Sequence, residues 1–255
     1  MNDHILTLAR EHAPCYLYEY DVMRRQVETL RQTFPRYDLL YSIKANPFPP
    51  VVRALAGLGL GADAASAPEV LLSRRCGMAR EDIFFSAAGK SDAALEAAWD
   101  EGEIIADSLG EVARIGALCE KKGQHRAIGV RINPAFGMGG AVGGPSKFGI
   151  NEEDLPQLKA LLDTLPVTVE GIHVHLKSQN LDADVLGGCY RDSWALAKRV
   201  RDALGCGMRY VNFGSGVGVA YDEAFEQPMA LERLRTYTDA IAADNDATLR
   251  ARLMI

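Results

Sequence analysis

The stretch VEGIHVHLK at residues 169–177 alternates apolar and polar side chains. Such alternation is typical of a β-strand with one buried face, because successive side chains of a strand point to opposite sides. The apolar set, which we expect to pack against helices, is Ile172, Val174 and Leu176. The opposite face would point to the interior of the fold, and it carries Gly171, His173, His175 and Lys177.

Similar runs occur along the whole chain and alternate with helical patterns. Eight strands are predicted, at 39–44, 60–65, 82–86, 103–106, 127–132, 169–175, 209–213 and 253–255. Helices are predicted between them, at 50–58, 68–76, 92–100, 111–122, 152–162, 184–204 and 229–252. Alternating strands and helices indicate βα units with a parallel sheet. Eight units in 255 residues predict an α/β fold of the (β/α)8 TIM-like barrel class.

The barrel is not expected to begin at residue 1. Residues 14–20, PCYLYEY, are rich in aromatic and β-prone side chains and predict a short strand outside the barrel. Residues 21–34 predict a helix with Asp21 as its N-cap. We therefore expect an N-terminal segment at 1–20 that belongs to another structural unit. The barrel would occupy 21–255 and end in its eighth strand.

Composition and charge exclude several classes of protein. A net charge of −6 argues against broad nucleic-acid binding. No apolar stretch approaches the roughly 20 residues that span a bilayer, and the N-terminus lacks the apolar core of a signal peptide. The five cysteines are odd in number and form no CxxC pair, which favours a reducing cytoplasm over a disulfide framework or a structural zinc site.

Four predicted strands end with an ionisable side chain on the inward face, namely Lys44, Asp63, Arg131 and His175. Any one of these could belong to an ion pair that fills the barrel. Four at equivalent positions favour an active site, because stability alone would favour branched apolar side chains there.

A glycine-rich run, GSGVG at 214–218, follows the seventh predicted strand. It is either a tight turn or a phosphate site, since phosphates commonly bind to the loops after strands seven and eight of such barrels. Lys44 could form a Schiff base with an aldehyde, aided by a cationic neighbour such as Arg131. Pyridoxal phosphate (PLP) combines an aldehyde with a phosphate, and His175 could stack on its ring.

A metal site is the alternative for the histidines, because His173 and His175 share a face. No third ligand lies at suitable spacing, so we predict no metal. We expect His173 to be a buried, hydrogen-bonded neighbour of His175.

Four motifs resemble the ornithine/diaminopimelate decarboxylase group of alanine-racemase-like (fold type III) pyridoxal enzymes. They are YSIKAN at 41–46, GADAAS at 61–66 with Glu69, GIHVHLKSQ at 171–179 and FGSGVG at 213–218. The resemblance runs from about residue 14 to residue 255. It implies PLP-dependent α-decarboxylation of an amino acid. It also implies a barrel joined to a C-terminal β-domain, to which the strand at 14–20 would belong, and a homodimer with shared active sites.

The resemblance also implies roles for individual residues. Lys44 would hold PLP as a Schiff base and His175 would stack on its ring. The phosphate would bind to Ser178, Gly214 and Gly216. The cofactor would further be surrounded by Asp63, Glu69 and Arg131. Lys147, in KFGI at 147–150, matches a family segment that could serve the dimer interface.

Some positions depart from the family pattern. Lys177 stands where glycine is usual, and Ser215 replaces a middle glycine. The loop at 133–150 is short and glycine-rich, which resembles paralogues of specialised metabolism more than the diaminopimelate decarboxylases of lysine biosynthesis. We therefore expect as substrate a small-molecule amino acid, or a derivative, with a distal polar group. Diaminopimelate itself is the alternative.

Two alternatives to an enzymatic function remain. The chain could be a single-barrel PLP carrier or a non-catalytic homologue. An alanine racemase fits less well, because Pro47 and Phe48 follow the lysine motif. The acidic partner of the pyridine nitrogen and the substrate-side residues are expected beyond Ile255. We therefore expect the 255-residue chain alone to decarboxylate nothing at a useful rate.

Overall fold

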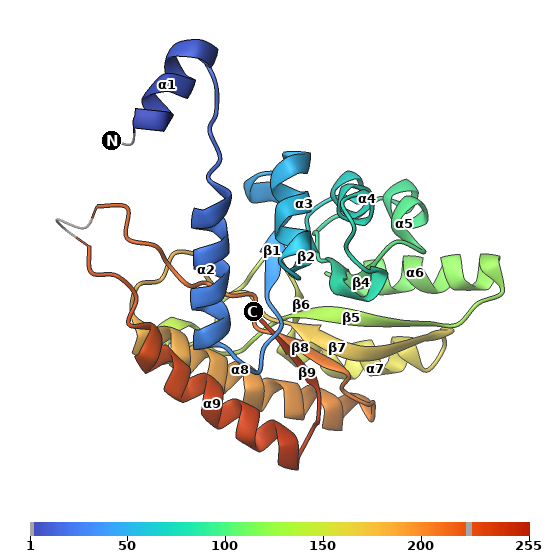
Figure 1. Ribbon diagram of the computed structural model, residues 1–255. Coiled ribbons are helices and arrows are strands. Elements are labelled where there is room, and N and C mark those ends of the chain that lie inside the picture. The colour runs from blue at the N-terminus through green and yellow to red at the C-terminus, as the bar shows by residue number, and fades with distance from the viewer. Residues whose placement is uncertain (1–2, 223–225) are drawn as a thin grey trace.

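Eight parallel strands form the central barrel (Figure 1). In this computed structural model, which describes residues 3–222 and 226–255, they follow the order β1-β2-β3-β4-β5-β7-β8-β9. Their bounds are Leu40–Ser42, Gly61–Ala64, Ile83–Phe85, Glu103–Ala106, Arg126–Asn133, Val167–His173, Tyr210–Asn212 and Arg252–Met254. A further strand, β6 (Ile150–Asn151), pairs with β5 outside this order.

The barrel is closed by hydrogen bonds between its last strand and the residues at its first. The Asp38 N–H donates to the Leu253 carbonyl over 2.8 Å, and the Leu40 N–H donates to the Ile255 carbonyl over 2.9 Å. The Ile255 N–H returns a bond of 3.0 Å to the Asp38 carbonyl. The predicted (β/α)8 class is therefore confirmed, and all eight predicted strands lie within a few residues of observed ones.

Helices alternate with the strands and cover the outside of the barrel (Figure 1). They are α2 (Tyr20–Thr33), α3 (Pro49–Gly57), α4 (Ala67–Arg75), α5 (Asp92–Ala98), α6 (Leu109–Lys122), α7 (Leu155–Leu162), α8 (Ala183–Leu204) and α9 (Leu231–Ala247). Serine N-caps begin α4, α5 and α6, where Ser66, Ser91 and Ser108 each accept a bond from the N–H three residues on. Of the helices in the described ranges, none is long and apolar enough to cross a bilayer.

The interior of the barrel is filled by a small buried cluster in which the Tyr210 ring packs against glycines. Tyr210 on β8 lies in a buried cluster with Phe84, Ile105 and Met254 from three other strands. A Cβ on Gly171 would come within 2.3 Å of the Tyr210 ring, and one on Gly129 within 2.2 Å of its hydroxyl. These two inward positions must therefore be glycine while Tyr210 occupies the interior.

The N-terminal segment differs from the sequence prediction. An unpredicted helix, α1 (Asp3–His12), projects from the barrel in Figure 1, and residues 13–19 form no strand. The prediction of a strand at 14–20 is wrong here because a strand needs a hydrogen-bonding partner, and no described strand pairs with this segment. Asp21 lies in the first turn of α2 rather than at its N-cap, which is Glu19.

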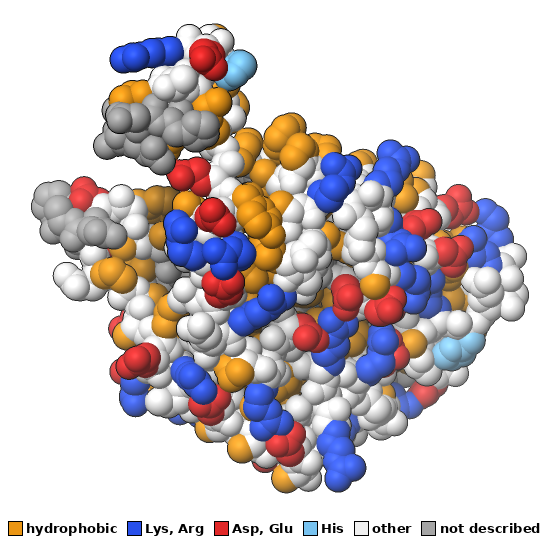
Figure 2. Space-filling model, viewed as in Figure 1, with side chains coloured by type: hydrophobic (Ala, Val, Ile, Leu, Met, Phe, Trp, Pro, Cys, Tyr) orange, Lys and Arg blue, Asp and Glu red, His pale blue; other side chains and the backbone are white. Residues whose placement is uncertain are grey.

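Residues 1 and 2 of the predicted segment at 1–20 lie outside the described residues. The segment carries exposed aromatic side chains, among them Tyr16 and Tyr18, and Phe48 is exposed just before α3. Figure 2 shows hydrophobic side chains gathered on the face that carries α2 and α3. The rings of Tyr18 and Phe48 stack at 5.6 Å, which ties the segment to the start of α3.

Candidate active site

A cavity of about 750 Å³ opens at the carboxyl ends of the barrel strands. Seven of the residues predicted to bind PLP line it, namely Lys44, Asp63, Arg131, His175, Ser178, Gly214 and Gly216. They come from five strands and the loops that follow them. The active sites of such barrels lie at this end.

Lys44 lies just beyond its strand. β1 ends at Ser42, and Lys44 belongs to a short 3-10 helix, Ile43–Ala45, rather than to the strand predicted at 39–44. The side chain is exposed toward the cavity and makes no hydrogen bond or ion pair with any residue of the described ranges. Its amine is therefore available to a ligand.

Asp63 on β2 is held by two serine hydroxyls. Ser42, its register partner on β1, donates to one carboxylate oxygen over 3.5 Å. Ser86, which follows β3, donates to the other oxygen. The carboxylate thus has a fixed orientation, with neutral donors rather than a cation as its partners.

Arg131 on β5 is fixed by an ion pair and by an aromatic ring. Its guanidinium lies 3.3 Å from the carboxylate of Asp107, and both side chains are largely buried. The same guanidinium lies 4.8 Å from the centroid of the Phe148 ring, at cation–π distance. Arg131 therefore presents a positioned positive charge to the cavity.

His175 follows β7 and bridges two loops. Its Nδ1 lies 2.8 Å from the Gly214 carbonyl oxygen and its Nε2 lies 3.2 Å from the Ser178 hydroxyl. A carbonyl only accepts, so Nδ1 carries the proton and donates. In the neutral imidazole, Nε2 then accepts from the hydroxyl. The two bonds fix the plane of the ring.

The loop at 214–218 has a backbone conformation that suits an anion. Gly214, Ser215 and Gly216 all have positive φ, at 66°, 54° and 101°. A Cβ on Gly214 would come within 2.5 Å of the Val174 carbonyl oxygen, so this position requires glycine. The Gly214 N–H donates to Asn212, whereas the N–H groups of Ser215 and Gly216 donate to no acceptor among the described residues.

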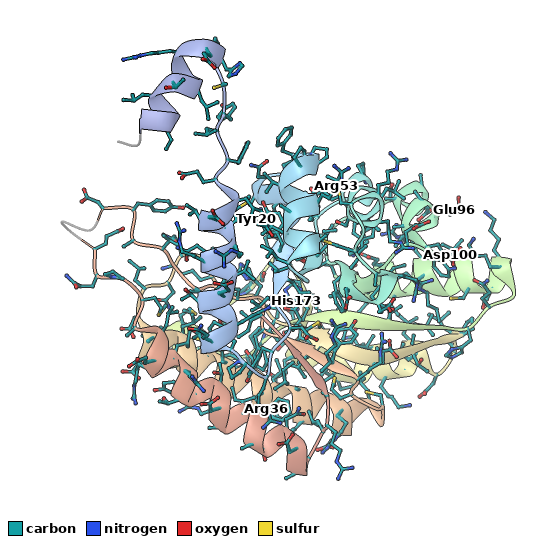
Figure 3. All side chains as sticks on the ribbon, in the orientation of Figure 1. Tyr20, Arg36, Arg53, Glu96, Asp100 and His173 are labelled. Carbon is teal, nitrogen blue, oxygen red and sulfur yellow. The ribbon has the colours of Figure 1, made fainter. Side chains whose placement is uncertain are left out.

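His173 lies deeper than His175 and is only 6% exposed. Figure 3 shows it among the strands, whereas Glu96 and Asp100 lie at the periphery. Burial, followed by the positive charge of Arg131, lowers the pKa of His173 well below its usual value. Its Nδ1 is buried without a hydrogen-bond partner in the described structure. The prediction of burial is thus confirmed, and that of a hydrogen bond is wrong.

The cavity contains polar residues that the sequence analysis did not single out, namely Ser42, Ser86, Gln179, Asn212 and Tyr221. Strand alternation could have found Ser42 and Asn212, which lie two residues after Leu40 and Tyr210 on the same faces. Conversely, Glu69, which the resemblance placed beside the cofactor, does not line it, and neither do Lys147 and Lys177, for which no cofactor role was predicted. Glu69 accepts the Ala65 N–H over 2.8 Å at the start of α4, and Lys147 and Lys177 are exposed beyond the rim.

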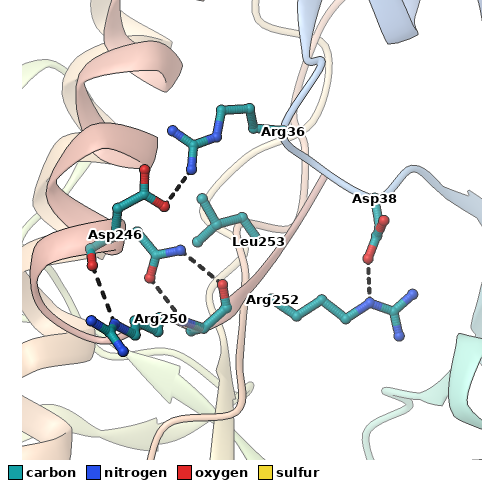
Figure 4. Close-up of a pocket in the computed structure, with 8 residues that line it drawn as sticks. Arg36, Asp38, Asp246, Arg250, Arg252 and Leu253 are labelled. Carbon is teal, nitrogen blue, oxygen red and sulfur yellow. Dashed lines mark hydrogen bonds and ion pairs between the residues drawn. The ribbon is translucent and has the colours of Figure 1, made fainter.

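A smaller cavity of about 430 Å³ lies at the opposite end of the barrel (Figure 4). Two of its three arginines are paired with neighbouring acids, Arg36 with Asp246 and Arg252 with Asp38, and the third, Arg250, donates to the Asp246 carbonyl. This arrangement is typical of a structural charge network. No cluster of three or more metal-ligating side chains occurs in the part of the chain that the structure describes.

Comparison with known proteins agrees with the geometry of the larger cavity. The family described as "Pyridoxal-dependent decarboxylase, pyridoxal binding domain" matches residues 20–251. The chain belongs to this family. The cofactor of this pyridoxal-binding domain is PLP, as predicted from the lysine and glycine motifs.

The relatives of this pyridoxal-binding domain are decarboxylases named after different substrates. It is 32% identical to the L-glutamyl-[BtrI acyl-carrier protein] decarboxylase of Niallia circulans, over 93% of this chain and 57% of that protein. It is 28% identical to the diaminopimelate decarboxylase of Aquifex aeolicus, over 84% of this chain and 53% of that protein. The pyridoxal-binding domain described here thus spans little more than half of each relative.

A solved structure confirms the fold. The diaminopimelate decarboxylase of Helicobacter pylori, complexed with L-lysine, superposes with a TM-score of 0.84 at 24% identity. The match covers 99% of this pyridoxal-binding domain and 65% of that chain.

Proposed function

We propose that the protein is a PLP-dependent amino-acid α-decarboxylase, a carboxy-lyase whose barrel holds the cofactor in the larger cavity. The observation that carries this proposal is that an unpaired amine, a glycine loop with unpaired amides and a fixed imidazole all meet in one cavity. PLP requires an amine for its aldehyde and donors for its phosphate. Lys44 supplies the first and the loop at 214–218 supplies the second.

The residues present fit PLP. Ser178, whose hydroxyl lies 3.2 Å from His175 Nε2, would turn that hydroxyl away from the ring to donate to the phosphate. The N–H groups of Ser215 and Gly216, which lack protein acceptors in the described ranges, would donate alongside it. The positive φ angles of Gly214, Ser215 and Gly216 keep this loop out of a regular hydrogen-bond ladder, and the amides of Ser215 and Gly216 have no acceptor in the described ranges. Gly214 also keeps the loop free of a Cβ that its neighbours would exclude.

Four other side chains would orient the cofactor and the substrate. Lys44 would bind the aldehyde and exchange it with the substrate amine. His175, held by the bond from its Nδ1 to the Gly214 carbonyl, would stack on the cofactor ring. Asp63 and Arg131 would place one negative and one positive charge at its edges. When bound, PLP supplies an electron sink for the electron pair that stays on the α-carbon when carbon dioxide leaves.

We further propose that the substrate is an α-amino acid, or a derivative, with a distal polar group. The names of the relatives support this, because one acts on a carrier-bound glutamyl group and another on diaminopimelate. Lysine-biosynthetic decarboxylation of diaminopimelate is the second candidate. The 255-residue chain alone is expected to decarboxylate nothing, so a panel of amino acids is assayed for carbon dioxide release by the barrel joined to the proposed C-terminal β-domain, which separates the two. Release from none of them would favour the carrier or non-catalytic reading.

The proposed assembly is a homodimer with shared active sites in the cytoplasm. The family resemblance of the four motifs supports the dimer. The five cysteines, all free, support a reducing compartment. The segment at 1–20 is proposed to pack with a β-domain, as the family resemblance implies.

Borohydride reduction tests the assignment of Lys44. The protein is mixed with PLP, reduced and digested, and the modified peptide is identified by mass spectrometry. We expect modification of Lys44, a visible absorbance band before reduction, and loss of both in Lys44→Ala. Lys177→Ala is the matched control, because Lys177 is an exposed lysine just beyond the cavity rim. Equal spectra of the wild type and Lys44→Ala would contradict the assignment.

A further inference from the structure

Two loops at the cavity are joined by a short parallel ladder. One follows β7 and carries Ser178, and the other follows β8 and carries the glycines. The Asn180 N–H donates to the Gly216 carbonyl over 2.9 Å, and the Gly218 N–H donates to the Asn180 carbonyl over 2.8 Å. A Cβ on Gly218 would come within 2.8 Å of the Asn180 oxygen, so the two backbones are in close contact.

The side chain of Gln179 adds a further rung to this ladder. Its Nε2 donates to the Val219 carbonyl over 2.5 Å, and its Oε1 accepts the Val219 N–H over 2.9 Å. A primary amide carries a donor and an acceptor in one plane, as a peptide group does. It can therefore pair with both polar groups of one backbone residue.

Gln179 has a backbone conformation that a glutamine seldom adopts. Its φ is 60°, in the left-handed region where residues other than Gly, Asn and Asp are uncommon. Such outliers persist where surrounding contacts determine them and are a reason to look for function. Here the surrounding contacts are the two side-chain bonds to Val219.

The ladder ends at the groups that would bind the phosphate. Ser178 immediately precedes Gln179, and the unpaired amides of Ser215 and Gly216 lie at the inner end of the partner loop. The Ser215 carbonyl is held from outside by the hydroxyl of Tyr190, over 3.0 Å. The distance between the Ser178 hydroxyl and these amides is thus set by how firmly the two loops are joined.

We propose that Gln179 is a positioning residue for the phosphate of PLP, joining the loop of Ser178 to the glycine loop at 214–218. This inference rests on the proposed function. The side-chain amide of Gln179 is engaged with Val219 and, among the described residues, makes no hydrogen bond with Lys44. Its removal should loosen the phosphate donors and leave the binding of the aldehyde to Lys44 intact.

A comparison of PLP with pyridoxal, which lacks the phosphate, isolates this role. The affinities of both aldehydes are measured by visible absorbance in the wild type, Gln179→Ala and Gln179→Asn. Asn keeps the amide and tolerates positive φ, but it is one methylene too short to reach Val219. We expect both variants to bind PLP about tenfold more weakly, as for the loss of one or two hydrogen bonds. Their affinity for pyridoxal should be unchanged.

Gln157→Ala is the matched control. Gln157 is also exposed and also donates through its amide, to Asp154 over 3.3 Å, but it lies on α7, outside the cavity. This variant should keep the wild-type preference for PLP. Circular dichroism checks that all variants are folded.

Three outcomes would overturn the inference. The first is a wild-type preference for PLP over pyridoxal in both Gln179 variants. The second is an equal loss of affinity for both aldehydes, which would indicate a general structural role. The third is equal binding of the two aldehydes by the wild-type protein, which would contradict the proposed phosphate site as well. Only the third also bears on the proposed function.

Discussion

His173 and His175 lie two residues apart on one face, yet the cavity places them in different environments. His175 has a hydrogen bond at each ring nitrogen, whereas Nδ1 of His173 is buried without one. The sequence could predict that both face inward, because strand alternation is a backbone property. It could not predict their partners, because these come from the loops after β7 and β8, whose conformations depend on three successive positive φ angles.

The buried imidazole predicts a pH dependence of stability. The folded pKa of His173 lies well below the unfolded value, so the unfolded chain takes up a proton that the folded chain does not. Stability should therefore fall as the pH drops below about 6.5, by about 1.4 kcal/mol in total between roughly pH 7.5 and 5.5.

Urea unfolding of the wild type and of His173→Asn at both pH values measures this contribution. The variant should lose less stability on acidification, by about the same 1.4 kcal/mol. Arg131 and His175 remain in the variant, so their own contributions cancel in the difference. Identical pH dependence of the two proteins would show that the imidazole is not held neutral.

At the scale of elements, the sequence predicted the order of strands and helices but not the ends of all of them. The prediction of a strand through Lys44 was wrong because the chain turns into a 3-10 helix at Ile43, which no apolar period indicates. Residues 14–20 have the composition of a strand, but strand formation depends on a partner and not on propensity alone.

A buried ion pair joins two elements beside the site. The ammonium of Lys90, which follows β3, lies 2.6 Å from the carboxylate of Glu111 in the first turn of α6, and both side chains are at most 1% exposed. The same ammonium donates to the carbonyls of Ala87 and Ile105, each over 2.6 Å. Burial lowers the pKa of Lys90 and raises that of Glu111. Ala87 lines the larger cavity, so the pair supports one of its walls.

Breaking this pair from one side should be costly. Lys90→Met would leave the Glu111 carboxylate buried without a cation, and we expect a loss of about 3–5 kcal/mol in the free energy of unfolding. The double variant Lys90→Met/Glu111→Leu should recover most of that loss, because it removes both charges. Urea denaturation of the two variants measures both values. A double variant no more stable than Lys90→Met would mean that the carbonyl contacts of Lys90, rather than its charge, stabilise the loop.

At the scale of the whole molecule, the barrel interior separates two polar ends. The Tyr210 ring closes the middle, and its hydroxyl is buried without a partner in the described structure. We expect Tyr210→Phe to be neutral or to stabilise the protein by up to about 1–3 kcal/mol, the cost of burying an unpaired hydroxyl. Thermal unfolding measures the change. Destabilisation by more than about 1 kcal/mol would indicate that the hydroxyl has a bound water as its partner.

The two ends of the barrel should respond independently to substitution. Arg252 on β9 pairs with Asp38 before β1 and with Asp82 before β3, the latter over 2.6 Å, at the end away from the larger cavity. These pairs are partly exposed, so Arg252→Met should lower the free energy of unfolding by only about 1–2 kcal/mol and leave the PLP affinity unchanged. Ser178→Ala should do the reverse, leaving stability unchanged and weakening PLP binding about tenfold or more. Urea unfolding and PLP titration of the same two variants give all four values.

The two variants should differ in this way because the groups that close the barrel and the groups that would bind the phosphate lie at opposite ends of the strands. Weaker PLP binding by folded Arg252→Met would show instead that closure of the barrel between β9 and β1 is transmitted along the strands to the loop at 214–218.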